Sequence, residues 1–303
     1  MSIDRWSLCD ILSDPPEARG AILLHHMEGF MDAGSAGKGV VDHLLEDFDH
    51  QPVASFDVDQ LIDYRSRRPN LTFSIDHWSN FEAPQLVVYL LHDKQGQPFL
   101  LLTGPEPDFA WERFVDAMED LIDYWSVSMT VGIQGIPMGV PHTRPLGLTV
   151  HATRPELVFD NRPVFSEMQI PGHAAGLLHL RLGESGRDAI GLAAHVPHYL
   201  VQMTYPASSL RLIEAITKAT SLELPTSSLE ISKEEVAEEI AQQISENSEV
   251  EDIIVTLEEQ YDSFAEQSES GEMLADGRVP TADELGAAFE SFLANQDRPD
   301  KNE

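Results

Sequence analysis

The sequence predicts an α/β fold, in which an open, mainly parallel sheet has helices on both faces. One observation leads to this fold class, and a second divides the chain into two regions. Short apolar runs alternate with stretches of helical spacing from residue 21 to residue 220, as in folds built from strand–helix–strand units. From residue 223 onward the sequence turns strongly acidic. We therefore expect residues 1–222 to form the α/β domain and residues 223–303 a small helical region.

The chain opens with a strand, a glycine-containing turn and a helix. Residues 21–27 form an apolar run typical of a buried strand, and apolar side chains recur at helical spacing from Val40 to Phe48. The turn between them holds Gly29, Gly34 and Gly37. Because glycine permits positive φ and helix N-terminal amides attract negative charge, this turn is a candidate anion or carbonyl cradle. The alternative interpretation is a plain strand-to-helix turn, since neither a Walker loop nor a dinucleotide fingerprint is present.

The later elements follow from the same two periodicities. Residues 85–91 and 98–103 lie close enough to form an antiparallel hairpin, and residues 109–125 carry one long apolar stripe. The basic cluster at 64–69 suits a solvated loop, an anion contact or an acidic surface of another subunit. The other expected strands are 52–56, 70–75, 126–133, 148–152 and 188–194, and the other expected helices are 172–182 and 208–220.

The acidic region carries helix signals of its own. Ser232 with Glu235 forms a capping box for a helix to about residue 245, and residues 250–264 show a second apolar stripe. Thr281 with Glu284 caps a last expected helix. Each stripe needs a partner, either the main domain or a neighbouring molecule.

Charge restricts the partners of the chain. The 303 residues carry a net charge of −33, and the residues from Glu223 onward carry 23 acidic against four basic side chains. Such a charge repels phosphates, so we expect neither nucleic acid nor a membrane as a partner. The single cysteine, Cys9, favours the cytoplasm, and the first 14 residues lack the apolar segment of a signal peptide.

Ligands of open α/β sheets bind beyond the carboxyl ends of the strands. Four loops are expected there, near residues 29–34, 103–107, 134–137 and 195–199, and a rigid proline-flanked loop at 141–145 adds a histidine and an arginine. The candidate crevice residues are Gly29, Phe30, Asp32, Gly34, Gly104, Glu106, Gln134, Gly135, His142, Arg144, His195 and His198.

These residues do not form a familiar catalytic set. No G-x-S-x-G motif is present, and Asp32 or Glu106 as a general acid or base cannot be decided from spacing. His195 and His198 would face opposite sides of a strand, so we predict no metal site, and we predict no cofactor. The adjacent His25 and His26 likewise face opposite sides of their strand.

Several motifs together resemble one protein family. They are Gly29-Phe30-Met31-Asp32-Ala33-Gly34, Gly135-Ile136-Pro137, Pro141-His142-Thr143-Arg144-Pro145 and Gly191-Leu192-Ala193-Ala194-His195-Val196-Pro197-His198-Tyr199. As a set they resemble the proteasome assembly chaperone 2 family, most of all its actinobacterial branch of uncharacterised proteins. The resemblance covers about residues 18–220 and extends to the final expected helix. It implies a three-layer α/β/α fold similar to nucleoside phosphorylases, with self-association and a small C-terminal helical region.

Two functions follow as hypotheses. The first is a non-catalytic assembly, scaffold or chaperone-like protein that associates with itself, a trimer being one option, and that contacts a protein partner through its C-terminal helices. The second is a small-ligand-binding protein or an enzyme that uses the crevice for a nucleoside-like or carboxylate compound.

Overall fold

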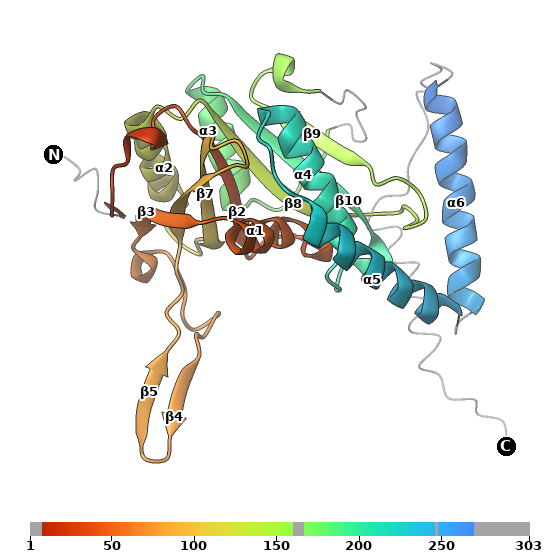
Figure 1. Ribbon diagram of the computed structural model, residues 1–303, viewed down its shortest axis with the longest axis horizontal. Helices are drawn as coiled ribbons and strands as arrows, with labels where there is room; N and C mark the ends of the chain where they lie inside the picture. Colours follow the sequence, from red (N-terminus) through yellow and green to blue (C-terminus); the bar gives the residue numbers. More distant parts are fainter. Residues whose placement is uncertain (1–7, 160–166, 246–247, 270–303) are drawn as a thin grey trace.

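An eight-stranded sheet lies at the centre of the computed structural model, which describes residues 8–159, 167–245 and 248–269 (Figure 1). The strand order is β1-β3-β6-β7-β2-β8-β10-β9. The bounds are β1 (Cys9–Ile11), β2 (Ile22–Glu28), β3 (His50–Phe56), β6 (Val87–His92), β7 (Pro98–Pro105), β8 (Met129–Met138), β9 (Leu148–Ala152) and β10 (Ala189–Pro197).

The central strands are parallel and the outer ones are antiparallel. β2 pairs in parallel with β7 and β8, and β8 pairs in parallel with β10. The expected hairpin of β6 and β7 is confirmed, and β3, β1 and β9 extend the antiparallel pairing to both edges. The sequence indicated only one antiparallel addition, because edge strands of three to seven residues carry little information about their direction.

Helices cover both faces of this sheet, as the alternation predicted. On one face, α2 (Trp111–Trp125) and α3 (Ala174–Glu184) pack over side chains such as Leu23 and Leu100. On the other face, α1 (Ala36–Asp47) and α4 (Pro206–Thr220) pack over Leu24 and Leu101. Neighbours in a strand thus serve opposite cores, which is the period of two expected of a sheet buried on both sides.

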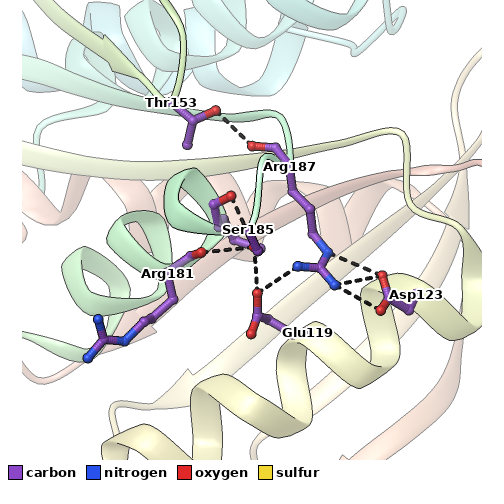
Figure 2. Close-up of polar contacts among 7 residues, drawn as sticks. Glu119, Asp123, Thr153, Arg181, Ser185 and Arg187 are labelled. Atoms are coloured by element: carbon purple, nitrogen blue, oxygen red, sulfur yellow. Dashed lines mark hydrogen bonds and ion pairs between the residues drawn. The ribbon is translucent and has the colours of Figure 1, made fainter.

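An ion-pair network holds α2 and α3 together (Figure 2). The Arg187 guanidinium, which follows α3, donates to Glu119 at 2.7 Å and to both carboxylate oxygens of Asp123 on α2. Ser185 donates to the same Glu119 carboxylate at 2.7 Å. The Arg187 carbonyl accepts from Thr153, which joins this corner to the end of β9.

Two central strands run further than the sequence predicted. β8 continues to Met138 instead of ending at residue 133, and β10 continues to Pro197 instead of ending at residue 194. The extension is one continuous parallel ladder, in which Gln134 pairs with Ala193 and Pro137 with Val196. Gln134, Gly135 and His195 therefore lie inside strands and not in loops beyond them.

A separate two-stranded hairpin, β4 (Leu71–Ser74) and β5 (His77–Phe81), projects from the sheet domain (Figure 1). The expected strand at 70–75 is confirmed in β4, whereas β5 was not foreseen. All side chains of β5 are exposed, and those of β4 are exposed or half-buried.

The C-terminal part begins with a packed segment. Leu222 and Leu224 lie in the core beneath α1 and α4, and the Glu223 amide donates to Asp93 at 2.8 Å. α5 (Ser227–Ser245) begins five residues before the predicted cap at Ser232, so that capping box is wrong; the Thr226 side chain bonds Glu230 instead. α6 (Ser248–Glu269) contains the predicted second stripe, and the expected helix from Thr281 lies outside the described residues.

In the parts of the chain described, no helix is both long and apolar enough to cross a lipid bilayer.

Replacing Arg187 tests the clamp between α2 and α3. We expect Arg187→Ala to lower the free energy of unfolding by about 1–2 kcal/mol, because it leaves the partly buried Glu119 without its cation. Urea denaturation followed by circular dichroism measures this change. The matched control is Glu184→Gln, whose exposed pair with Arg181 should contribute little. Equal stabilities for the two variants would contradict the clamp.

Candidate functional site

Asp32 occupies the cradle that the opening turn was expected to offer. Its Oδ1 atom accepts from the amides of Gly37 and Gly135, each at 2.8 Å, and its Oδ2 atom accepts from the Lys38 amide at 2.9 Å. Two of these amides belong to the N-terminus of α1 and the third belongs to β8. The positive end of the helix dipole thus meets a carboxylate from within the chain.

Glycines make this close approach possible. A Cβ on Gly135 would lie 2.1 Å from the Ala33 carbonyl oxygen, and a Cβ on Gly37 would lie 2.4 Å from Nδ1 of His26. Gly34 has φ +64° and bonds Val201 through its amide and Tyr205 through its carbonyl. The turn is therefore a joint that ties β2, α1 and β8 to the segment before α4.

A second group lies where β2 and β7 end. The Glu106 amide donates to the Glu28 carbonyl, and its Oε1 atom accepts from the Ala174 amide at 2.6 Å, which caps α3. Gly29 and Gly104 have φ +146° and +139°, and a Cβ on Gly104 would overlap the Gln85 carbonyl oxygen at 2.1 Å. Phe30 stacks on His173 with ring centroids 4.3 Å apart and an interplanar angle of 7°.

Arg67 of the basic cluster fastens this group to the root of the projecting hairpin. Its guanidinium donates to the Glu28 carbonyl at 3.2 Å, to the Glu106 carbonyl and to the Asp108 carboxylate, with which it forms a short ion pair. Arg65 and Arg68 are exposed. The cluster thus supplies one internal clamp and two surface cations.

A third group joins the proline-flanked loop to α6. The Arg144 guanidinium forms a bidentate pair with Asp262 at 2.8 and 2.7 Å and lies 3.3 Å from Glu258. Thr143 donates to Glu258, and the Tyr261 hydroxyl donates to the Pro145 carbonyl at 2.9 Å. The sequence analysis did not single out these partners on α6, although Glu258 and Asp262 are spaced to share one helix face.

Burial and pairing shift the pKa values in this third group. Burial lowers the pKa of His142, whose amide and Nδ1 atom both lie 2.8 Å from the Tyr199 hydroxyl, and burial raises the pKa of Tyr199. The hydrogen bond from Arg144 lowers the pKa of Asp262, which keeps that exposed carboxylate ionised. The chain therefore holds α6 against the loop by a charged pair that high salt would weaken.

Three further candidates lie in or directly after β8 and β10, and the His198 ring contacts that of Tyr199. His195 is buried in β10, over Gly147, with its Nε2 atom 2.8 Å from the Thr149 hydroxyl on β9. His198 follows in a short 3-10 turn, where burial lowers its pKa. Gln134 lies within the β8 ladder.

The contacts of the candidates fall into three groups. Asp32, Gly34 and Gly135 form the joint at α1; Gly29, Phe30, Gly104 and Glu106 surround the start of α3; His142 and Arg144 lie under α6. Asp32, Glu106, Arg144 and His142 all bond other groups of the chain. Within the described ranges, no three His, Cys, Asp or Glu side chains are placed to hold a metal ion.

Removing the Asp32 charge tests the joint. We expect Asp32→Asn to lower the free energy of unfolding by about 2–3 kcal/mol, because an amide nitrogen would face at least one backbone N–H. Chemical denaturation measures the effect. Asp42→Asn, on α1 itself, is the control, since Asp42 pairs with the exposed Lys38. A native-like stability of Asp32→Asn would contradict the joint.

Comparison with known proteins gives a consistent result. The sequence model described as PAC2 family matches residues 26–244. Among curated protein sequences, none matches the chain. Two similar solved structures are proteins of unknown function: Rv2714 of Mycobacterium tuberculosis has 41% identity and a TM-score of 0.83, covering 88% of this chain and 93% of its own, and a Corynebacterium glutamicum protein has 35% identity and a TM-score of 0.80, covering 86% and 99%.

A third structure shares the fold at lower identity. It is the proteasome-assembly chaperone homologue Rv2125 of Mycobacterium tuberculosis, with 23% identity, a TM-score of 0.71, and coverage of 77% of this chain and 99% of its own. The family model spans more than half of the chain, and the two nearer relatives align along almost their whole length. The predicted family and α/β fold are thus confirmed: the chain belongs to the PAC2 family.

Proposed function

We propose that this protein is a self-associating, non-catalytic assembly or scaffold protein of the cytoplasm with a chaperone-like role. Family membership supports this proposal, because structures with the same fold include a proteasome-assembly chaperone homologue and an archaeal proteasome activator. The observation that carries it is the apolar face of the projecting hairpin. The single, buried Cys9 suits a reducing compartment.

The hairpin of β4 and β5 is amphipathic. Leu71 lies opposite Phe81 and Phe73 lies opposite Trp78, and residues directly opposite in a ladder point to the same face. These four side chains are 50 to 63% exposed, and Phe73 and Trp78 touch edge to face. The other face carries polar pairs, Thr72 with Asn80 and Ser74 with His77.

Such a hairpin needs a covering surface. Isolated two-stranded hairpins are at best marginally stable in water, and an apolar patch of this kind on a soluble protein marks an interaction site. Ile75 at the tip is 97% exposed and has φ +55°, so the tip, too, lies away from its own domain. The energy that orders the hairpin must come from another molecule.

A second copy of this chain is the occupant that we propose. Every copy presents the same uncovered face, so closed association covers all of them at once, in a dimer or in a ring such as a trimer. Beside the hairpin root lies a groove of about 580 Å³, and Phe81 of the hairpin is among the residues that line it. Asp10, Asp57 and Asp59 in its lining complement the exposed Arg65 and Arg68 of another copy.

The engaged polar groups support the non-catalytic part of the proposal. Glu106 and Asp32, the candidate general acids or bases, each accept backbone amides of their own chain. A general base needs a free position within hydrogen-bond reach of a substrate proton. The hypothesis of a small-ligand site keeps one favourable observation, the Phe30–His173 stack at the end of β2, which offers a flat aromatic surface.

The C-terminal helices provide the proposed surface for a second protein. α5 packs on α4 and buries Ile240 against Val196 and Tyr205, so the helix is fixed to the domain. Its outer side exposes Glu234, Glu235, Glu238 and Glu239. A partner that recognises this row would carry basic side chains, and its association would be faster at low salt.

Substitutions on the apolar face of the hairpin test the proposed self-association. We expect the native chain to be an oligomer and Phe73→Ser/Trp78→Ser to be a monomer that keeps the circular dichroism spectrum of the native chain, because both side chains are exposed in the protomer. Native mass spectrometry reports the subunit number and any retained small molecule. The control is Thr72→Ala/Asn80→Ala on the polar face. A monomeric native chain, or an oligomeric apolar-face variant, would exclude this interface, and a fixed extra mass would favour the ligand hypothesis.

The acidic row of α5 is tested by neutralisation. We expect at least tenfold less crosslinked protein partner to be recovered from the native host with the variant Glu234→Gln/Glu235→Gln/Glu238→Gln/Glu239→Gln than with the native chain. The control removes the same charge from exposed sites of the α/β domain: Glu17→Gln/Glu46→Gln/Asp49→Asn/Asp116→Asn. An equal loss of recovered partner with both variants would show that the overall negative charge, and not α5, binds the partner. No loss with either variant would contradict binding through α5.

A further inference from the structure

Four residues lie side by side across the sheet, from the central strand β2 to the edge strand β9. In the strand pairing, His25 of β2 is the partner of Gly132 of β8, Gly132 is the partner of Gly191 of β10, and Gly191 is the partner of His151 of β9. The row thus reads histidine, glycine, glycine, histidine. Because directly opposed residues point to the same face, both imidazoles lie on the side covered by α3.

A third imidazole, that of His179 on α3, lies between the rings of His25 and His151. The His179 ring lies 5.2 Å from the His25 ring and 5.2 Å from the His151 ring, measured between centroids, and it meets both rings edge to face. Nε2 of His179 lies 3.1 Å from Nε2 of His25. The three rings therefore form one cluster, in which His25 is buried beneath α3 and His151 is exposed on the edge strand β9.

The two glycines provide the space for these rings. A Cβ on Gly132 would lie 2.9 Å from Nε2 of His25 and 3.0 Å from Nε2 of His179. A Cβ on Gly191 would lie 2.0 Å from Nε2 of His151. Any residue with a Cβ atom at these positions would displace α3 or one of the rings. The surface on which α3 packs, here called its seat, therefore leaves room for the histidines only because both positions are glycine.

The cluster accepts only neutral rings. With two Nε2 atoms 3.1 Å apart, one must donate its N–H and the other must accept; a proton added to the acceptor ring would place two N–H groups face to face. The Nδ1 atoms of His25 and His179 are buried without a hydrogen-bond partner, so neither offers a ready site for an added proton.

The surroundings provide no stabilising charge. The groups that act electrostatically on His25 and His179 are other histidines: His26 on β2, His151 on β9 and His173 on α3. β7 contributes Leu102 beside His25, and the charged residues of α2 that contact α3, Glu112 and Glu119, bind Arg181, Arg187 and Ser185. Burial lowers the pKa of His25 to about 3 and also lowers that of His179, whereas His151 is exposed on the edge strand β9.

We propose that the docking of α3 on the sheet is proton-sensitive, and that mild acidification releases this helix through protonation of His25 and His179. Released rings would titrate near pH 6.5, as histidine does in water, whereas docked rings stay neutral to lower pH. Below about pH 6.5 the released state therefore binds more protons. Each pH unit then favours release by up to tenfold for each of these two histidines, or about a hundredfold for both.

Release of α3 would alter the second group of candidate residues. The Ala174 amide at the start of α3 bonds Glu106, and His173 stacks on Phe30. Both contacts would be lost when α3 leaves the sheet. Acidification would thereby open the ends of β2 and β7, which are closed at neutral pH.

Hydrogen exchange of the full-length protein at pH 7.5 and pH 5.5, corrected for intrinsic exchange rates, tests the proposal. We expect protection of the α3 amides to fall at least tenfold more than that of β8 and α4, and by up to about a hundredfold. We expect His179→Leu to reduce this pH dependence, whereas His77→Gln, at an exposed site on the hairpin, should leave it unchanged.

Three results would overturn the proposal. The first is that the protection of the α3 amides in the native chain does not depend on pH. The second is an equal loss of protection in α3, β8 and α4 of the native chain, which would show global unfolding. Full pH dependence in folded His179→Leu would exclude the cluster as its cause. The native measurement alone decides the first two, so the test does not depend on a variant that folds.

Discussion

The carboxylate of Asp32 is the interaction on which the rest of the structure depends. Its two oxygens accept from three amides, two at the start of α1 and one on β8, so that one side chain joins the segment after β2 to α1 and to β8. Charge-assisted hydrogen bonds of this kind are stronger than neutral ones. The joint holds the N-terminus of α1 at the carboxyl edge of the sheet, where a phosphate or carboxylate ligand binds in many α/β proteins.

That joint also explains why the sequence was informative about the fold and less so about the site. Apolar periodicity is a local property, so it revealed the strand before Gly29 and the helix after Gly37. A glycine turn before a helix looks the same whether its amides bind a ligand or an aspartate five residues earlier. The partner amide on Gly135 lies 103 residues away, and no local pattern could pair it with Asp32.

Other differences have the same origin in distant contacts. β8 passes residue 133 because Gln134–Pro137 find parallel partners in β10, although the Gly-Ile-Pro sequence is typical of a turn. Of the hairpin at 71–81, the sequence predicted only the first strand, because Leu71 and Phe73 alternate with polar residues. The second strand, β5, was missed, because a register shift after Thr72 interrupts its regular pairing with β4. Its apolar face became evident only once the pairing of Phe73 with Trp78 was known.

The histidine cluster shows the same dependence on register most directly. His25 and His26 were expected on opposite faces, and they are: His26 contacts the Ile133 carbonyl on the α1 side, whereas His25 meets His179 on the α3 side. Nothing in the sequence connects His25 with Gly132, Gly191 and His151, because their alignment requires three strand registers at once. The protein leaves apolar side chains out of the centre of this seat, although burial of aliphatic groups would bind α3 more firmly. A seat of neutral imidazoles over two glycines is a weaker attachment, and its strength depends on pH.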